Sequence, residues 1–131
     1  MNTQIISIRI AGVITALFAS FHLLFYWLFD WKVKLQNLDL DTWAIFHTFN
    51  VCMDFFFILF AFISFRYSKQ LINETLGRVW LFSMIMIYSI RIVCEFILWG
   101  YTQMQSPVII ILCLIPIIGY GFPLIKNRTN N

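Results

Sequence analysis

The sequence predicts an all-α membrane protein whose four transmembrane helices form an antiparallel, up-down-up-down bundle. Of the 131 residues, 61% are hydrophobic and 11% are charged, whereas soluble domains have about 45–50% and about 25%. A soluble chain of this length has too little interior to bury that apolar excess. Four apolar stretches are each long enough to cross a bilayer, and the connections between them are short. We therefore expect residues 1–131 to form a single transmembrane domain.

Each apolar stretch has about 20 residues, which at about 1.5 Å per helical residue matches a hydrocarbon core about 30 Å thick. The predicted spans are residues 10–29, 43–65, 79–99 and 107–125. Asp41 or Thr42 can cap the amino end of the second span. Ser106 followed by Pro107 is typical of a helix start and predicts where the fourth span begins.

The distribution of basic residues predicts the orientation, because cytoplasmic connections retain Lys and Arg. Six basic residues lie in the two tails and the second connection: Arg9, Arg66, Lys69, Arg78, Lys126 and Arg128. The first and third connections hold two, Lys32 and Lys34. This places both termini in the cytoplasm, in the manner of a bacterial inner (plasma) membrane protein. The net charge of +3 is small and scattered, so we expect the lipid bilayer as a partner and no nucleic acid.

Strongly polar side chains inside the predicted spans are costly and indicate function by default. There are six of them: His22, His47, Asn50, Asp54, Arg91 and Glu95. At 100° per residue, the three on the second span share an arc of about 60°, and Arg91 and Glu95 share a similar arc with Tyr88. All six fall in or near the outer half of the predicted bundle, between about 6 and 16 Å from the outer boundary. The sequence therefore predicts one contiguous polar site.

Small residues on the first span indicate where it packs. Ala11, Thr15 and Ala19 recur every four residues, a spacing that lets helices approach closely in membranes. A parallel track begins at Gly12. His22 projects near the first track, so we expect it to point into the bundle.

The mixed charges favour a pocket for an amphiphilic ligand of the lipid, quinone or isoprenoid type. Asp54, Glu95 and His47 are the candidate catalytic acid/base residues, and His22, Asn50, Tyr88 and Arg91 are the candidate ligand-binding residues. Arg91 is the expected anchor and Asp54 its expected interhelical partner. With both histidines neutral, Arg91 faces two carboxylates, so a proton is expected to be retained in the cluster. Whether the protein is an enzyme stays open.

Several other interpretations of these residues stay open. Arg91 and Glu95, four residues apart, could form a purely structural ion pair. The two histidines could simply hydrogen-bond between helices, or could ligate haem b. A metal ion could use both histidines with Asp54 and Glu95, although the spacing is not a metal signature and Arg91 would repel a cation, so no metal ligand is assigned.

The chain could also be an accessory subunit of a larger membrane complex, in which the polar residues would only fix helix register. Cys52, Cys94 and Cys113 lie inside apolar stretches without a pairing pattern, so neither a disulfide nor a covalently attached haem is expected. No motif indicates a known family.

Overall fold

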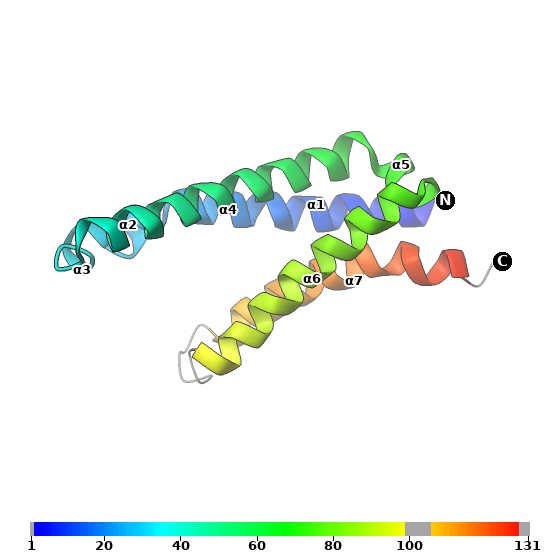
Figure 1. The fold of residues 1–131 in the computed structure, drawn as a ribbon. Helices are drawn as coiled ribbons and strands as arrows, with labels where there is room; N and C mark the ends of the chain where they lie inside the picture. The colour runs from blue at the N-terminus through cyan, green and yellow to red at the C-terminus, as the bar shows by residue number, and fades with distance from the viewer. Residues whose placement is uncertain (1, 99–105, 129–131) are drawn as a thin grey trace.

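The computed structural model describes residues 2–98 and 106–128. Within these ranges the secondary structure is entirely helical (Figure 1). The helices are α1 (Asn2–Leu23), α2 (Phe25–Leu28), α3 (Trp31–Lys34), α4 (Leu40–Arg66), α5 (Ser68–Asn73), α6 (Thr75–Leu98) and α7 (Ser106–Arg128). Four helical segments are long and apolar enough to cross a membrane: α1, α4, α6 and residues 106–126 of α7. The predicted all-α class and the presence of four apolar helices long enough to span a membrane are confirmed.

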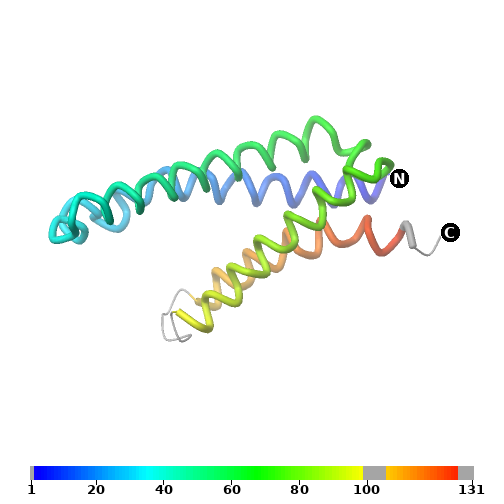
Figure 2. Tube along the Cα trace, viewed as in Figure 1, coloured from blue at the N-terminus to red at the C-terminus, as the bar shows by residue number. Residues whose placement is uncertain are grey.

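The long helices are arranged as two pairs. α1 packs along α4, α6 packs along α7, and α1 also packs against α7, whereas α4 and α6 are not among the described helix pairs in extensive contact. Figure 1 shows the two pairs close together near α5 and the chain termini, and diverging toward the other end. The trace in Figure 2 follows the same divergence. We call the end where the two pairs meet the closed end, and the end where they diverge the open end.

The first long helix differs in position from the predicted span. It runs from Asn2 to Leu23, whereas hydropathy placed the span at residues 10–29. Tertiary contacts explain the early start, because Ile8 is fully buried and the Ser7 hydroxyl donates to the carbonyl of Gly119 on α7. After Leu23 the chain continues as the short helices α2 and α3, separated by Asp30 at φ 49°.

The start of α4 also differs from the prediction, because the cap is Asp39 and neither Asp41 nor Thr42. Asp39 has an extended backbone, and its Oδ1 accepts from the backbone N–H of Thr42 at 2.9 Å. The Thr42 hydroxyl donates to Oδ2 at 2.7 Å. These donors lower the pKa of Asp39 from its ordinary value, the backbone N–H contributing most. Ser106, by contrast, begins α7 as predicted.

Glycines permit close approaches of α1 to α4 and to α7 at the closed end. A Cβ built on Gly12 would lie 2.9 Å from the Cβ of Ser64 on α4, and one on Gly119 would lie 2.8 Å from the Cβ of Ala11 on α1. Both distances are too short for carbon atoms in contact, so only glycine fits without a shift. The small-residue tracks of α1 therefore lie where α4 and α7 pack against it, as their spacing predicted.

Candidate functional site

Four buried hydroxyls, one from each long helix, join where the pairs meet. The Tyr88 hydroxyl donates to Thr15 Oγ1 at 2.8 Å. The Tyr120 hydroxyl lies 2.9 Å from Thr15 Oγ1 and 3.0 Å from Ser64 Oγ. Thr15 and Ser64 also donate to the carbonyls four residues earlier on their own helices. All four residues are at most 1% exposed, so the network ties the two helix pairs together.

Beside this hydroxyl network is a cavity of about 290 Å³, which we call the central cavity. All four long helices line it, through Phe18, His22, Met53, Phe57, Ile87, Tyr88, Ile90, Arg91, Cys94 and Cys113. Most of this wall is apolar, and the Tyr88 hydroxyl is already bonded to Thr15. The strongly polar groups left to meet a ligand are therefore His22 from α1 and Arg91 from α6.

The hydrogen bonding of His22 fixes which ring nitrogen is available. Nδ1 lies 2.9 Å from the carbonyl oxygen of Phe18. A carbonyl oxygen only accepts, so Nδ1 carries the proton, and Nε2 of the neutral ring is an acceptor. The ring stacks on Phe25 at a centroid distance of 4.3 Å and is tilted against Phe57 at 5.0 Å. These contacts hold the imidazole at the cavity wall.

Arg91 is held by a carboxylate on its own helix. Its Nη1 lies 2.7 Å from Oε2 of Glu95, one helical turn away, which is an ion-pair distance. The two atoms do not meet the geometry of a hydrogen bond. The other Glu95 oxygen accepts from the Ser106 hydroxyl at the start of α7. Glu95 is 1% exposed, whereas the Arg91 side chain is 35% exposed. Glu95 thus orients Arg91, whose remaining N–H groups can meet a ligand.

Asp54 occupies a different position from the one expected. It forms no ion pair with Arg91, whose carboxylate partner in the described chain is Glu95. Asp54 is 6% exposed, and its Oδ1 has no hydrogen-bond partner. It is not a lining residue of the central cavity. The expected Asp54–Arg91 bridge is therefore not formed.

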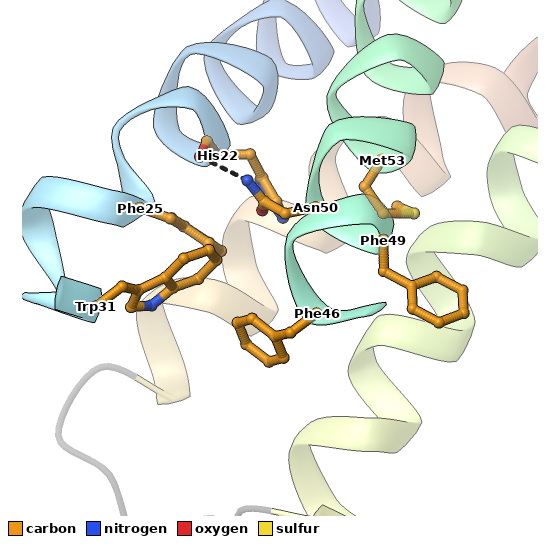
Figure 3. A pocket seen from close by; sticks show the side chains of 7 residues that line it. All are labelled: His22, Phe25, Trp31, Phe46, Phe49, Asn50 and Met53. Carbon is orange, nitrogen blue, oxygen red and sulfur yellow. Dashed lines mark hydrogen bonds between the residues drawn. The ribbon is translucent and has the colours of Figure 1, made fainter. Parts of the chain in front are cut away.

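A second cavity of about 190 Å³, the aromatic cavity, adjoins the central one at His22 and Met53, which line both. Figure 3 shows its lining residues: His22, Phe25, Trp31, Phe46, Phe49, Asn50 and Met53. The Asn50 Nδ2 donates to the backbone carbonyl of His22 at 3.5 Å, drawn as a dashed line in Figure 3. Asn50 therefore links α4 to the end of α1 and does not reach the central cavity.

His47 lies apart from the other predicted site residues. Its ring packs among Trp43, Trp31 and Tyr26, at centroid distances of 4.1, 5.3 and 6.0 Å. Its Nε2 is buried without a hydrogen-bond partner. His47 lines neither cavity, whereas His22 lines both.

The structure brings together part of the predicted set. His22, Tyr88 and Arg91 share the central cavity, Glu95 supports Arg91, and Asp54 is buried outside the cavity wall. Asn50 and His47 lie elsewhere. In the described ranges, no three His, Cys, Asp or Glu side chains gather as a metal site requires, so the four residues considered as metal ligands do not form one.

Sequence reasoning missed four residues that shape the site: Thr15 as a hydrogen-bonding group, Ser64, Ser106 and Tyr120. A usable signal existed, because each places a hydroxyl inside or at the start of an apolar helix.

The chain was also compared with known proteins. The chain matches no family model, no curated protein and no solved structure.

Proposed function

We propose that this protein is an integral membrane protein with four spans of alternating direction and both termini in the cytoplasm of a bacterial cell. The excess of basic residues in the tails and the second connection supports this orientation. The positions of both termini and α5 at one end of the molecule agree with it (Figure 1). The open end, with the central cavity, then lies toward the outer half of the membrane.

We further propose that the central cavity binds an amphiphilic ligand. The observation that carries this proposal is the cavity itself, an apolar enclosure formed by four helices with His22 and Arg91 in its wall. Small-molecule sites have this composition, in which a few convergent polar groups fix orientation and apolar groups supply contact area. In a membrane, a ligand with a polar head and an apolar tail satisfies both parts of the wall.

The size of the cavity favours binding of a head group. About 290 Å³ is at the lower limit of typical ligand pockets, about 300 to 1,000 Å³. It accommodates a head group and the first atoms of a chain, not a whole lipid. Since α4 and α6 are not in extensive contact, the tail has a path between the helix pairs into the bilayer.

The geometry favours binding over acid/base catalysis. Of the three candidate acid/base residues, Glu95 is engaged by Arg91 and Ser106, and His47 lines neither cavity. Asp54 is buried outside the cavity wall. General acid/base catalysis needs a group within hydrogen-bond reach of the reacting atom, and none of these three meets that condition in the central cavity.

Cysteine alkylation tests the proposal directly, because Cys94 lines the central cavity whereas Cys52 on α4 is exposed and lines neither cavity. Two variants, each retaining one of these cysteines and serine at the other two cysteine positions, are treated with N-ethylmaleimide in mild detergent. The probes are a monoacylglycerol, a lysophosphatidic acid and a short-chain quinone. At least one should slow alkylation of Cys94 at least fivefold while leaving Cys52 unchanged. Absence of selective protection by any probe would contradict the proposal.

Arg91 provides a second test with a matched control. Arg91→Leu removes the charged group at the cavity, whereas Arg66→Leu removes an exposed arginine at the end of α4. We expect Arg91→Leu to abolish the protection of Cys94 and Arg66→Leu to preserve it. Equal behaviour of both variants would show that Arg91 has no special role in binding.

A second candidate function is that of an accessory subunit in a larger membrane complex. The observation that favours it is the outer face of α4, where Phe55 and Phe62 are both more than half exposed and which α6 does not cover extensively. A partner helix could pack there as well as lipid does. Stable association with a defined membrane partner through purification, lost on changing these phenylalanines to alanine, would favour this function.

A further inference from the structure

The charges around the central cavity carry information about the head group, provided that the proposed binding function holds. Arg91 faces the cavity, but its positive charge is matched by Glu95 at 2.7 Å. This pair contributes no net charge to the wall. A cavity prepared for a phosphate or other anion instead needs positive charge in excess, because burying an unmatched anion in a low dielectric is costly.

The remaining charged groups do not supply that excess. Asp54 is 6% exposed, and its Oδ1 accepts no hydrogen bond. An ionised carboxylate buried without this hydrogen bond is costly, so Asp54 contributes a neutral carboxyl, and His22 contributes a neutral ring. Asp54, His22, Arg91 and Glu95 together then sum to zero, and an anionic head group would bring an unmatched negative charge.

The hydrogen-bonding groups point to the same class of ligand. Because His22 Nδ1 is bonded to the Phe18 carbonyl, Nε2 of the neutral ring offers an acceptor, which matches a hydroxyl donor. The N–H groups of Arg91 not facing Glu95 match a carbonyl or ester oxygen. The two residues come from different helices and line one cavity, so a head group with both functions can contact both.

We propose that the central cavity selects an uncharged amphiphile whose head group presents a hydroxyl to His22 and a carbonyl oxygen to Arg91, and that it discriminates against the same molecule bearing a phosphate. A monoacylglycerol has this chemistry on a single chain. The corresponding lysophosphatidic acid keeps the chain, the ester carbonyl and one hydroxyl, and replaces the other hydroxyl with a phosphate. The methyl ester of the same fatty acid keeps the carbonyl alone.

Protection of Cys94 from N-ethylmaleimide at pH 7, titrated with each of these three probes, tests the selectivity. The half-protecting concentration should be at least tenfold lower for the monoacylglycerol than for the lysophosphatidic acid, and at least fivefold lower than for the methyl ester. Stronger or equal protection by the lysophosphatidic acid would overturn the proposal while leaving the binding function intact. Equal protection by the methyl ester would overturn the hydroxyl contact. Failure of every probe would instead contradict the binding function itself.

Charge variants test the cause of the selectivity. Glu95→Gln leaves Arg91 without its matching charge, so lysophosphatidic acid should bind at least tenfold better than to the unchanged protein. Glu95→Met removes the same charge and keeps the test valid if Glu95→Gln does not fold. Glu74→Gln, at the exposed junction of α5 and α6, is the control and should change nothing. Unchanged preference in a folded Glu95→Gln or Glu95→Met variant would contradict the charge argument.

Discussion

The hydroxyl network predicts similar effects of two conservative substitutions, Tyr120→Phe and Tyr88→Phe, each larger than that of the same change at an exposed tyrosine. Each removes one oxygen and leaves the ring. The Tyr120 hydroxyl contacts both Thr15 and Ser64, at 2.9 and 3.0 Å, whereas the Tyr88 hydroxyl contacts Thr15 alone. Both rings are at most 1% exposed, so water does not replace the lost oxygen in either case.

The expected magnitude follows from counting donors and acceptors. In Tyr120→Phe the remaining hydroxyl protons keep acceptors, because Thr15 and Ser64 donate to backbone carbonyls and Tyr88 donates to Thr15. Tyr120 has one hydroxyl proton to give to Thr15 or Ser64, so the loss is one hydrogen bond, without a buried unpaired donor. Side-chain hydrogen bonds between membrane helices average about 0.6 kcal/mol. We expect Tyr120→Phe and Tyr88→Phe each to lower the free energy of unfolding by about 0.6 kcal/mol.

Reversible unfolding by sodium dodecyl sulfate in mixed micelles measures these differences. The control is Tyr67→Phe, because Tyr67 is 41% exposed and lies outside the network; its effect should be close to zero. The double variant Tyr88→Phe with Thr15→Val should lose less than the sum of the single variants, since they share one hydrogen bond. An effect of Tyr120→Phe or Tyr88→Phe as small as that of Tyr67→Phe, or strict additivity in the cycle, would refute the network.

Two other substitutions test the packing and the helix cap. Gly119→Ala should lower the free energy of unfolding by about 1–3 kcal/mol because its Cβ would meet α1. Gly121→Ala, whose Cβ would meet one side-chain atom at 3.9 Å, should be neutral or slightly stabilising in the same unfolding assay. Asp39→Ala should lower the melting temperature at pH 7 more than Asp41→Ala. The Thr42 N–H lowers the pKa of Asp39 in the folded protein. The carboxylate therefore stabilises the fold above the ordinary aspartate pKa, and this stabilisation is lost as the pH falls through the lowered pKa. The difference in melting temperature between Asp39→Ala and the unchanged protein should therefore shrink at pH 3.

The helices and part of the site could be predicted because the signals for them are local. Hydropathy identifies the spans, and the spacing of Arg91 and Glu95 predicts the ion pair found between them. Local signals do not specify how helix pairs tilt or how a connection folds back. His47 shares a helix face with Asp54, yet its ring packs against Trp31 of α3, a contact that depends on the path of the chain after α1. The cap at Asp39, by contrast, is a local contact with Thr42, and it was mispredicted because Asp39, Asp41 and Thr42 are all suitable capping residue types.

The neutral hydroxyls were harder to predict than the charged residues for a physical reason that also explains the position of the cavity. Thr15 and Ser64 donate to carbonyls of their own helices, so each is compatible with a helix in lipid even before the helices associate. Their presence in an apolar stretch is therefore a weak signal of a functional or structural site. They can therefore lie where backbones approach most closely, beside Gly12. Arg91 and His22 require more space and a partner of opposite charge or polarity. Close packing at the hydroxyl network and divergence beyond it place these larger polar groups at a cavity wall, where a ligand can reach them.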